Sequence, residues 1–458
     1  MDAAAFLHHL ISLPDYRQQI VHSQRIPPQD AIFGKLDNPL HPSLQACLEF
    51  LGISALYSHQ AKALNAILAG KNVIIATPSA SGKTLCYQLA TLDALLHDKD
   101  SRALYIFPTK ALAQDQLRSL KQIAHSLSPA LRALSAGLPG AVATFDGDTP
   151  QNDRANIRKQ ARIVLTNPDM LHLGILPNHQ SWSKLFYNLK YVVIDETHIY
   201  RGVFGSHVAN VLRRLRRLCA FHGSTPQFIC CSATIANPQE HAQNLVGLPF
   251  EAIVEDGSPH GEKYFTFWNP PVIDEAKTSR RSSNSEAAFL LGELVQKEIR
   301  SLVFASTRKL TELIYIYTRE QLSPSLRDKI SPYRAGYLSE DRRRIEHQFF
   351  NGELLGLVAT TALELGINIG DLEATVLTGY PGSIASAWQQ AGRSGRSTHS
   401  ALSFLIAQQS PLDQYLMRNP DFFFSKNFDN AIINPDNPYI LSGIGDRRSG
   451  MPSLMAFS

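Results

Sequence analysis

Short apolar runs alternate with longer segments of helical period along most of the chain, and this alternation restricts the fold more than any other feature. The runs are rich in Val and Ile, and the segments between them place apolar residues at helical spacing. The first series is VIIA from Val73, ALYIF from Ala103, RIVLT from Arg162, YVVID from Tyr191 and FICCS from Phe228. The second series is LVFAS from Leu302, GLVAT from Gly356, ATVLT from Ala374 and ALSFLIA from Ala401. This order predicts an α/β fold with parallel sheets.

A polar, serine-rich stretch, VIDEAKTSRRSSNSEA at residues 272–287, separates the two series. Its composition is typical of a linker. We therefore expect one α/β lobe at 51–271 and another at 288–425, with a ligand cleft between them at the carboxyl ends of the strands. The proline-rich residues 1–50 are predicted to form an irregular extension on the first lobe, and residues 426–458 to form a truncated tail.

Composition excludes several classes of protein. With 44% hydrophobic and 18% charged residues, and no run of 18 apolar residues, the chain is expected to be globular and to have no membrane partner. Its N-terminus lacks the basic region of a secretory signal, so a cytoplasmic location is expected. The five cysteines form no C-x-x-C pair, and neither zinc nor a disulfide framework is predicted. A net charge of +4 is compatible with a polyanionic partner without establishing one.

The stretch TPSASGKT at residues 77–84 follows the first apolar run and precedes an amphipathic segment. A loop between strand and helix directs backbone N–H groups and the positive end of the helix dipole toward phosphate. Its G-K-T ending fits a nucleotide-binding loop, although Thr77 replaces the usual first glycine. Lys83 would reach the β- and γ-phosphates, and the Thr84 hydroxyl would hold Mg²⁺. The predicted phosphate-binding residues are Thr77, Ser79, Ala80, Ser81, Gly82, Lys83 and Thr84.

Two adjacent carboxylates end the apolar run YVVIDETH at residues 191–198. Paired like charges are unusual where a strand ends, and a bound cation explains them better than a solvated acidic loop does. Asp195 would hold Mg²⁺, while Glu196 would orient and deprotonate an attacking water. The sequence therefore predicts a site for phosphoryl hydrolysis.

The second lobe carries QQAGRSGR at residues 389–396. Its two glycines let the backbone turn and hold Arg393 and Arg396 at fixed spacing. Guanidinium groups brought across a cleft to a γ-phosphate stabilise transition-state charge. Because these arginines and Lys83 lie on different lobes, hydrolysis is expected to require closure.

With these motifs in order, the chain resembles the superfamily 2 helicases of the DEAD/DEAH-box kind over roughly residues 51–408. The matching stretches are TPSASGKT, PTKALAQDQ at 108–116, TNPDML at 166–171, DETH at 195–198, SAT at 232–234, FASTRK at 304–309, TTALELGINIGD at 360–371 and QQAGRSGR. The resemblance implies two tandem RecA-like domains, an ATP cleft between them, and ATP with Mg²⁺. Ala80 departs from the family's inner glycine.

The resemblance also implies roles for individual residues. Gln60 would read adenine, with Tyr57 packed on it. Gly366 and Asn368 would complete the nucleotide site, although the family usually has aspartate where Asn368 stands. The residues implied to couple the γ-phosphate to lobe movement are His198, Ser232, Thr234 and Gln389. Those implied to grip the nucleic-acid backbone are Pro108, Thr109, Thr166, Asn167, Ser306, Thr307, Thr360 and Thr361.

Finer details resemble the mitomycin repair factor A group of DNA helicases: YSHQAKAL at 57–64, YRGVFGSHVANVLRRLRRL at 200–218 and DNPYIL at 436–441. That resemblance implies 3′ to 5′ movement on single-stranded DNA in DNA repair. Because contacts to the nucleic-acid backbone do not exclude RNA, an RNA helicase stays open. So does a truncated nucleic-acid-binding remnant with little unwinding activity. We expect the arginines of the second stretch to form a solvated basic face rather than to contact the strand.

Overall fold

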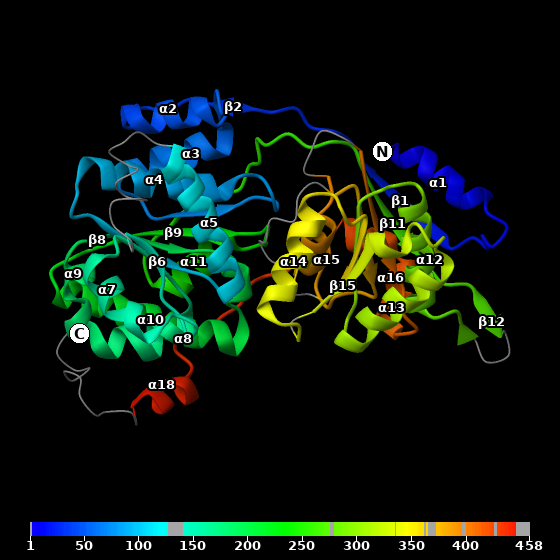
Figure 1. The fold of residues 1–458 in the computed structure, drawn as a ribbon. Coiled ribbons are helices and arrows are strands. Elements are labelled where there is room, and N and C mark those ends of the chain that lie inside the picture. The colour runs from blue at the N-terminus through cyan, green and yellow to red at the C-terminus, as the bar shows by residue number, and fades with distance from the viewer. Residues whose placement is uncertain are drawn as a thin grey trace.

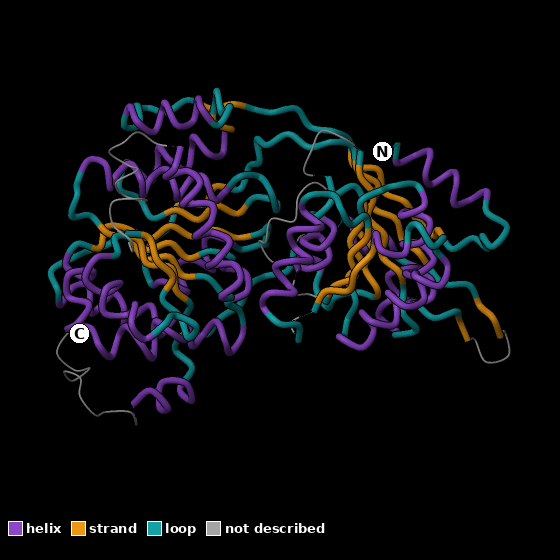
Figure 2. The backbone as a smooth tube through the Cα atoms, in the orientation of Figure 1, coloured by secondary structure: helices purple, strands orange, loops and turns teal. Residues whose placement is uncertain are grey.

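The computed structural model describes residues 2–126, 141–274, 279–334, 336–360, 363–364, 372–395, 400–425 and 428–445. Within these ranges the chain forms two seven-stranded sheets with helices on both faces (Figure 1, Figure 2). This architecture confirms the predicted α/β fold with two mainly parallel sheets. No helix in the described part of the chain is long and apolar enough to cross a membrane.

The first sheet is parallel throughout, in the order β10-β4-β9-β8-β5-β7-β6. Its strands are β4 (Val73–Ala76), β5 (Arg102–Ile106), β6 (Val142–Thr144), β7 (Ile163–Thr166), β8 (Leu189–Ile194), β9 (Gln227–Ser232) and β10 (Glu251–Ile253). Val73 and Ile75 face one apolar core, and Ile74 and Ala76 face the other. A strand buried on both faces needs apolar residues at every position, which explains the continuous apolar runs.

Helices cover both faces of this sheet. They are α2 (Pro42–Phe50), α3 (Ser58–Leu68), α4 (Lys83–His97), α5 (Lys110–Ser126), α7 (Gln151–Gln160), α8 (Pro168–Met170), α9 (Ser183–Tyr187), α10 (Gly202–Phe221) and α11 (Pro238–Val246). Short helical turns occur at η1 (Leu171–Ile175), η2 (Leu176–Trp182) and η3 (Thr197–Ile199). A small strand pair, β2 (Phe33–Gly34) and β3 (Leu56–Tyr57), precedes α3.

The second sheet has the order β1-β11-β18-β17-β14-β16-β15, and only β1 is antiparallel. Its strands are β1 (Ile20–Ile26), β11 (Lys263–Trp268), β14 (Ser301–Phe304), β15 (Ile330–Tyr333), β16 (Gly356–Ala359), β17 (Ala374–Thr378) and β18 (Ala401–Ile406). Its helices are α1 (Ala3–Ser12), α12 (Ser283–Gln296), α13 (Arg308–Gln321), α14 (Ser339–Phe350), α15 (Ile384–Ala391), α16 (Pro411–Arg418) and α17 (Pro420–Phe424). A short turn, η4 (Arg327–Lys329), precedes β15.

Two predicted boundaries need correction. Helix α1 and strand β1 belong to the second lobe, not the first, because Phe6 and Leu10 pack into its core and β1 pairs with β11 (Figure 1). Strand β11 also lies in the second sheet, beside β18, although it falls within the predicted first lobe. The predicted linker at 272–287 instead contains β12 (Val272–Asp274), β13 (Ser279–Arg280) and the start of α12.

The described chain crosses between the lobes three times, at residues 27–32, 254–262 and 428–437. The last crossing corrects the expectation for the tail, since residues 428–437 return to the first lobe. Ile433 enters the first lobe's core, and Asn434 N donates to Ser206 Oγ at 2.9 Å. Helix α18 (Pro438–Gly445) follows this strap, which we define as residues 428–437 (Figure 1).

Candidate active site between the two lobes

The stretch predicted to bind phosphate forms the loop between β4 and α4. Helix α4 begins at Lys83, and Gly82 has φ of 84°, a left-handed conformation that glycine adopts without strain. Ala80 also has a positive φ, 68°, which costs a residue with a Cβ on the order of 1 kcal/mol. The backbone therefore keeps a tight turn even where Ala80 replaces a glycine.

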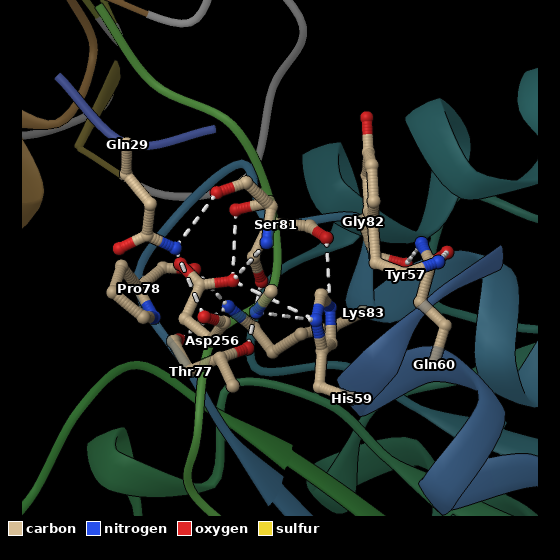
Figure 3. Close-up of polar contacts among 12 residues, drawn as sticks. Gln29, Tyr57, His59, Gln60, Thr77, Pro78, Ser81, Gly82, Lys83 and Asp256 are labelled. Atoms are coloured by element: carbon tan, nitrogen blue, oxygen red, sulfur yellow. Dashed lines mark hydrogen bonds and ion pairs between the residues drawn. The ribbon is translucent and has the colours of Figure 1, made fainter. Parts of the chain in front are cut away.

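Polar side chains hold this loop together (Figure 3). Lys83 Nζ donates to the carbonyl oxygens of Thr77 and Pro78, each at 2.7 Å. The hydroxyls of Thr77 and Ser81 lie 2.7 Å apart. The Lys83 ammonium is therefore held directly against the predicted phosphate-binding loop.

The two predicted adenine-contacting residues lie beside the loop. Gln60 Oε1 accepts from Tyr57 N at 3.0 Å, and its Nε2 donates to Gly82 O at 3.1 Å. A Cβ at Gly82 would lie 2.5 Å from Gln60 Nε2 and would displace that amide, and the positive φ of 84° also favours glycine there. Phe33 stacks on Tyr57 with ring centroids 5.8 Å apart, and this aromatic surface was missed because Phe33 is distant in sequence.

The predicted acidic pair ends strand β8, with little exposure to solvent. Asp195 is 7% exposed and accepts hydrogen bonds from Glu196 N at 2.9 Å and from Tyr87 Oη at 3.1 Å. Burial, and then the neighbouring charge of Glu196, raise the pKa of Asp195 to about 7. Burial also raises the pKa of Glu196, against the nearby cations Lys83 and Arg393. A carboxylate whose pKa is raised in this way accepts a proton more readily than an ordinary one does.

The residues predicted to hold Mg²⁺ converge on one buried group. The Thr84 hydroxyl and the Asp195 carboxylate both interact with the phenol of Tyr87. A hydroxyl and a carboxylate are oxygen ligands of the kind that Mg²⁺ uses in phosphate sites. The donor set therefore fits the ion. No cluster of three or more His, Cys, Asp or Glu residues suited to a metal occurs in the described ranges.

Two of the predicted coupling residues meet across the lobes. The Gln389 amide nitrogen lies 2.8 Å from His198 Nε2, and Ala233 N donates to His198 Nδ1 at 3.2 Å. Since a neutral ring accepts at one nitrogen only, Nε2 carries the proton and the Gln389 amide oxygen is its natural partner. Burial lowers the pKa of His198 to about 3. The other two residues, Ser232 and Thr234, flank Ala233.

The arginine loop of the second lobe meets the phosphate loop of the first. A Cβ added at Gly392 would lie 3.5 Å from Ser79 Cβ, so the two loops lie next to each other. Arg393 is 2% exposed, and its Nε donates to Glu364 O at 3.2 Å. Its positive charge opposes the rise that burial causes in the pKa of Glu196. Lys83, Glu196 and Arg393 therefore lie near enough for their charges to interact. Arg396, Gly366 and Asn368 lie outside the described residues.

A cavity of about 390 Å³ adjoins this junction between the lobes. His198 and Arg201 line it from the first lobe, Glu364 and Gln389 from the second, and Asp429 from the strap. The strap thus forms part of the boundary between the lobes.

The residues predicted to grip nucleic acid stand where strands end and helices begin. Asn167 Oδ1 caps α8 by accepting from Met170 N at 2.8 Å, and Thr307 caps α13. The others that the structure describes at such positions are Pro108, Thr109, Ser306 and Thr360. The prediction for Thr166 needs correction. Its side chain is 1% exposed and its hydroxyl donates to Phe145 O at 2.7 Å, so this hydroxyl holds the loop and does not face a nucleic-acid strand. Thr361 lies outside the described residues.

Lys263 is a site residue that the sequence analysis missed. Its Nζ donates to the carbonyl oxygens of Ala391 and Ser394, which flank the arginine. Desolvation lowers the pKa of this lysine to about 7. Since Lys263 starts a strand far from residue 393 in sequence, no local pattern could have indicated the contact.

Two family models match the chain. The DEAD/DEAH box helicase model covers residues 57–241, and the helicase conserved C-terminal domain model covers residues 286–398. The chain therefore belongs to the DEAD/DEAH box helicases of superfamily 2.

The chain is also similar in sequence to individual helicases over most of its length. The chain is 45% identical to the uncharacterized ATP-dependent helicase YprA of Bacillus subtilis, over 95% of this chain and 57% of YprA. It is 41% identical to the ATP-dependent helicase HRQ1 of Saccharomyces cerevisiae, over 95% of this chain and 41% of HRQ1. A crystal structure of the DUF1998 helicase MrfA bound to DNA and AMPPNP matches with a TM-score of 0.88 and 44% identity, over 96% of this chain and 60% of that one. The chain thus spans less than two thirds of each relative.

Proposed function

We propose that this chain is the motor of an ATP-dependent helicase that moves 3′ to 5′ along single-stranded DNA in DNA repair. The observation that carries the proposal is the close approach of the phosphate loop and the arginine loop, at Ser79 and Gly392. A triphosphate at that contact would touch cationic groups of both lobes. Its hydrolysis would then depend on how the lobes are placed.

The buried side chains suit phosphoryl transfer. Lys83 and Arg393 supply positive charge where it develops on the phosphates in the transition state. Glu196 orients the attacking water and takes its proton, which its raised pKa favours. Thr84 and Asp195 would hold Mg²⁺, which neutralises phosphate charge when it is bound.

The same junction supports coupling to movement. Gln389 contacts His198, which lies two residues after the acidic pair, and the helix of Gln389 ends at the arginine loop. A change at the phosphates can therefore displace α15 and, with it, the second lobe. Caps and free N–H groups at the strand ends of both lobes suit a sequence-independent grip on phosphates. The likeness to MrfA, solved with DNA, favours DNA, and the polarity and repair role rest on resemblance to its group.

ATP turnover with and without single-stranded DNA tests this proposal. We expect DNA to stimulate the wild-type rate, and Glu196→Gln to lower it by ~10² to 10⁴, because the general base is lost. Lys83→Ala should lower it as well. Turnover equal to that of these variants would contradict the proposal. A matched RNA strand that stimulates better than DNA would instead favour the RNA helicase, and unwinding of duplexes with opposite overhangs tests the polarity.

A further inference from the structure

Two of the three crossings between the lobes in the described chain lie side by side and are joined by backbone hydrogen bonds. Gln29 and His260 exchange backbone hydrogen bonds of 2.9 and 3.1 Å, and Ile32 N donates to Gly257 O at 2.9 Å. Gln29 Nε2 also donates to the carbonyl oxygens of Asp256 and Ser258 (Figure 3). Residues 27–32 and 254–262, which we call the paired connectors, are therefore hydrogen-bonded to each other along their length.

The ring of His59 links these connectors to the phosphate loop (Figure 3). It is 0% exposed, and its Nδ1 accepts from Gly257 N at 3.2 Å. Because Nδ1 accepts, Nε2 carries the proton and donates to Ser81 O at 2.9 Å. Asp256 Oδ1 lies 3.6 Å from Nδ1 and is oriented by Ser258. One ring thus joins a peptide group of the loop to a peptide group of the connectors.

The atoms around Gly257 are closely packed, which restricts movement of its peptide group. A Cβ at Gly257 would lie 2.2 Å from Ser58 Oγ and 2.8 Å from Ile32 O. Ser58 N, next to the histidine in sequence, donates to Ile32 O at 2.7 Å. Close-packed peptide groups transmit small displacements rather than absorbing them. A shift of the Ser81 peptide would therefore displace the Gly257 peptide through the His59 ring.

We propose that His59 is a positioning residue that transmits the conformation of the phosphate loop to the paired connectors on which the lobes turn. A histidine that served only the core would satisfy both nitrogens within it, whereas this ring bonds the nucleotide loop on one side and the inter-lobe connector on the other. The inference rests on the proposed function in one respect, that a nucleotide binds the loop.

Hydrogen exchange of residues 254–262, with and without AMP-PNP, tests the link in the whole chain. His59→Phe keeps a ring without either hydrogen bond. His59→Gln keeps a donor near the Nε2 position, and His59→Asn keeps an acceptor near the Nδ1 position. In the wild type we expect AMP-PNP to change exchange in the connectors by roughly tenfold. All three variants should lose most of that change, because each breaks at least one end of the link.

Calorimetric binding of AMP-PNP and thermal melting are measured on the same samples. A variant that melts early is set aside in favour of the other two, which probe the same link. Wild-type protein that binds AMP-PNP without any change in connector exchange would overturn the inference and leave the ATPase proposal standing. A His59→Phe response equal to that of the wild type would overturn it too. Failure of the wild type to bind AMP-PNP would overturn both.

Discussion

At the residue scale, the charge state of His198 decides whether the contact between the lobes survives acidification. Its pKa in the folded chain, about 3, lies below the ordinary 6.5, so the folded state binds fewer protons than the unfolded state between these values. Stability from this group is present above pH 6.5 and is lost as the pH falls. Relative to His198→Gln, which does not titrate, we expect the wild type to lose ~2 kcal/mol of unfolding free energy between pH 7 and pH 5.

Urea unfolding of both proteins at each pH measures this difference. The comparison is needed because Asp195 and Glu196, whose pKa values are raised, act in the opposite direction and gain stability on acidification. A constant gap between the two proteins would show that His198 does not stay neutral in the folded chain.

Lys263 gives a second prediction at this scale. The carbonyl of Ala391, at the end of α15, accepts from its Nζ and also from the hydroxyls of Ser394 and Ser403. Lys263→Met removes the cation that holds the arginine loop at a helix C-terminus. We expect kcat for ATP to fall about tenfold with little change in KM, because Arg393 acts on the transition state. Lys329→Met, at an exposed lysine of the same lobe, is the matched control, and a kcat of Lys263→Met within twofold of wild type would refute the role.

Single residues were predictable where their chemistry is local in sequence. Glu196 lies just after an apolar strand, and Lys83 begins the helix after the loop that follows another, so the local pattern indicated where both residues lie. His59 and Lys263 act on peptide groups of distant segments, and Phe33 stacks on a residue from another strand. Such contacts are set by the packed fold and leave no local pattern.

At the scale of elements, the strap is joined to both lobes by hydrogen bonds between side chains and backbone N–H groups. Asn237 Oδ1 accepts from Ala431 N at 2.8 Å, and Ile384 N of the second lobe donates to Asp429 Oδ2 at 3.2 Å. Two arginines of the basic face of α10 also contact protein groups. Arg213 pairs with Asp436 of the strap, and Arg216 donates to Gly247 O. The predicted solvated face therefore lacks these two side chains as free cations.

Asn237→Ala and Asp436→Asn separate the two kinds of contact. The first leaves a buried strap N–H without its acceptor and should lower stability by ~1 to 2 kcal/mol. The second breaks an ion pair whose carboxylate is 76% exposed, and should stay within about 0.5 kcal/mol of wild type. Denaturant midpoints of the two variants test this order, and the reverse order would mean that charge holds the strap.

Elements were predictable where burial dictates composition. The central strands are mostly apolar because helices cover both faces of each sheet, and the sequence shows these strands as apolar runs. Strand β1 alternates between partly buried and exposed residues at the edge of a sheet, so its sequence is a weak signal. Which sheet β11 would join depended on its pairing with β18, which lies far along the chain.

At the scale of the whole molecule, two lobes are joined by paired connectors on one side and by a strap elsewhere, with the predicted nucleotide site between them (Figure 1). Such a design converts a change at one contact into rotation of a lobe. The order of motifs was enough to predict two lobes. It was not enough to predict that the chain crosses between them three times, because crossings depend on which sheet each strand joins.

The central claim is that both lobes clamp one triphosphate, and Arg393→Ala tests it most directly. Single-turnover ATP hydrolysis with saturating DNA is compared with AMP-PNP affinity, and Arg319→Ala, at an exposed arginine of the same lobe, is the control. The account predicts that Arg393→Ala slows hydrolysis by ~10³ or more while AMP-PNP still binds. Hydrolysis at the wild-type rate in Arg393→Ala would contradict it.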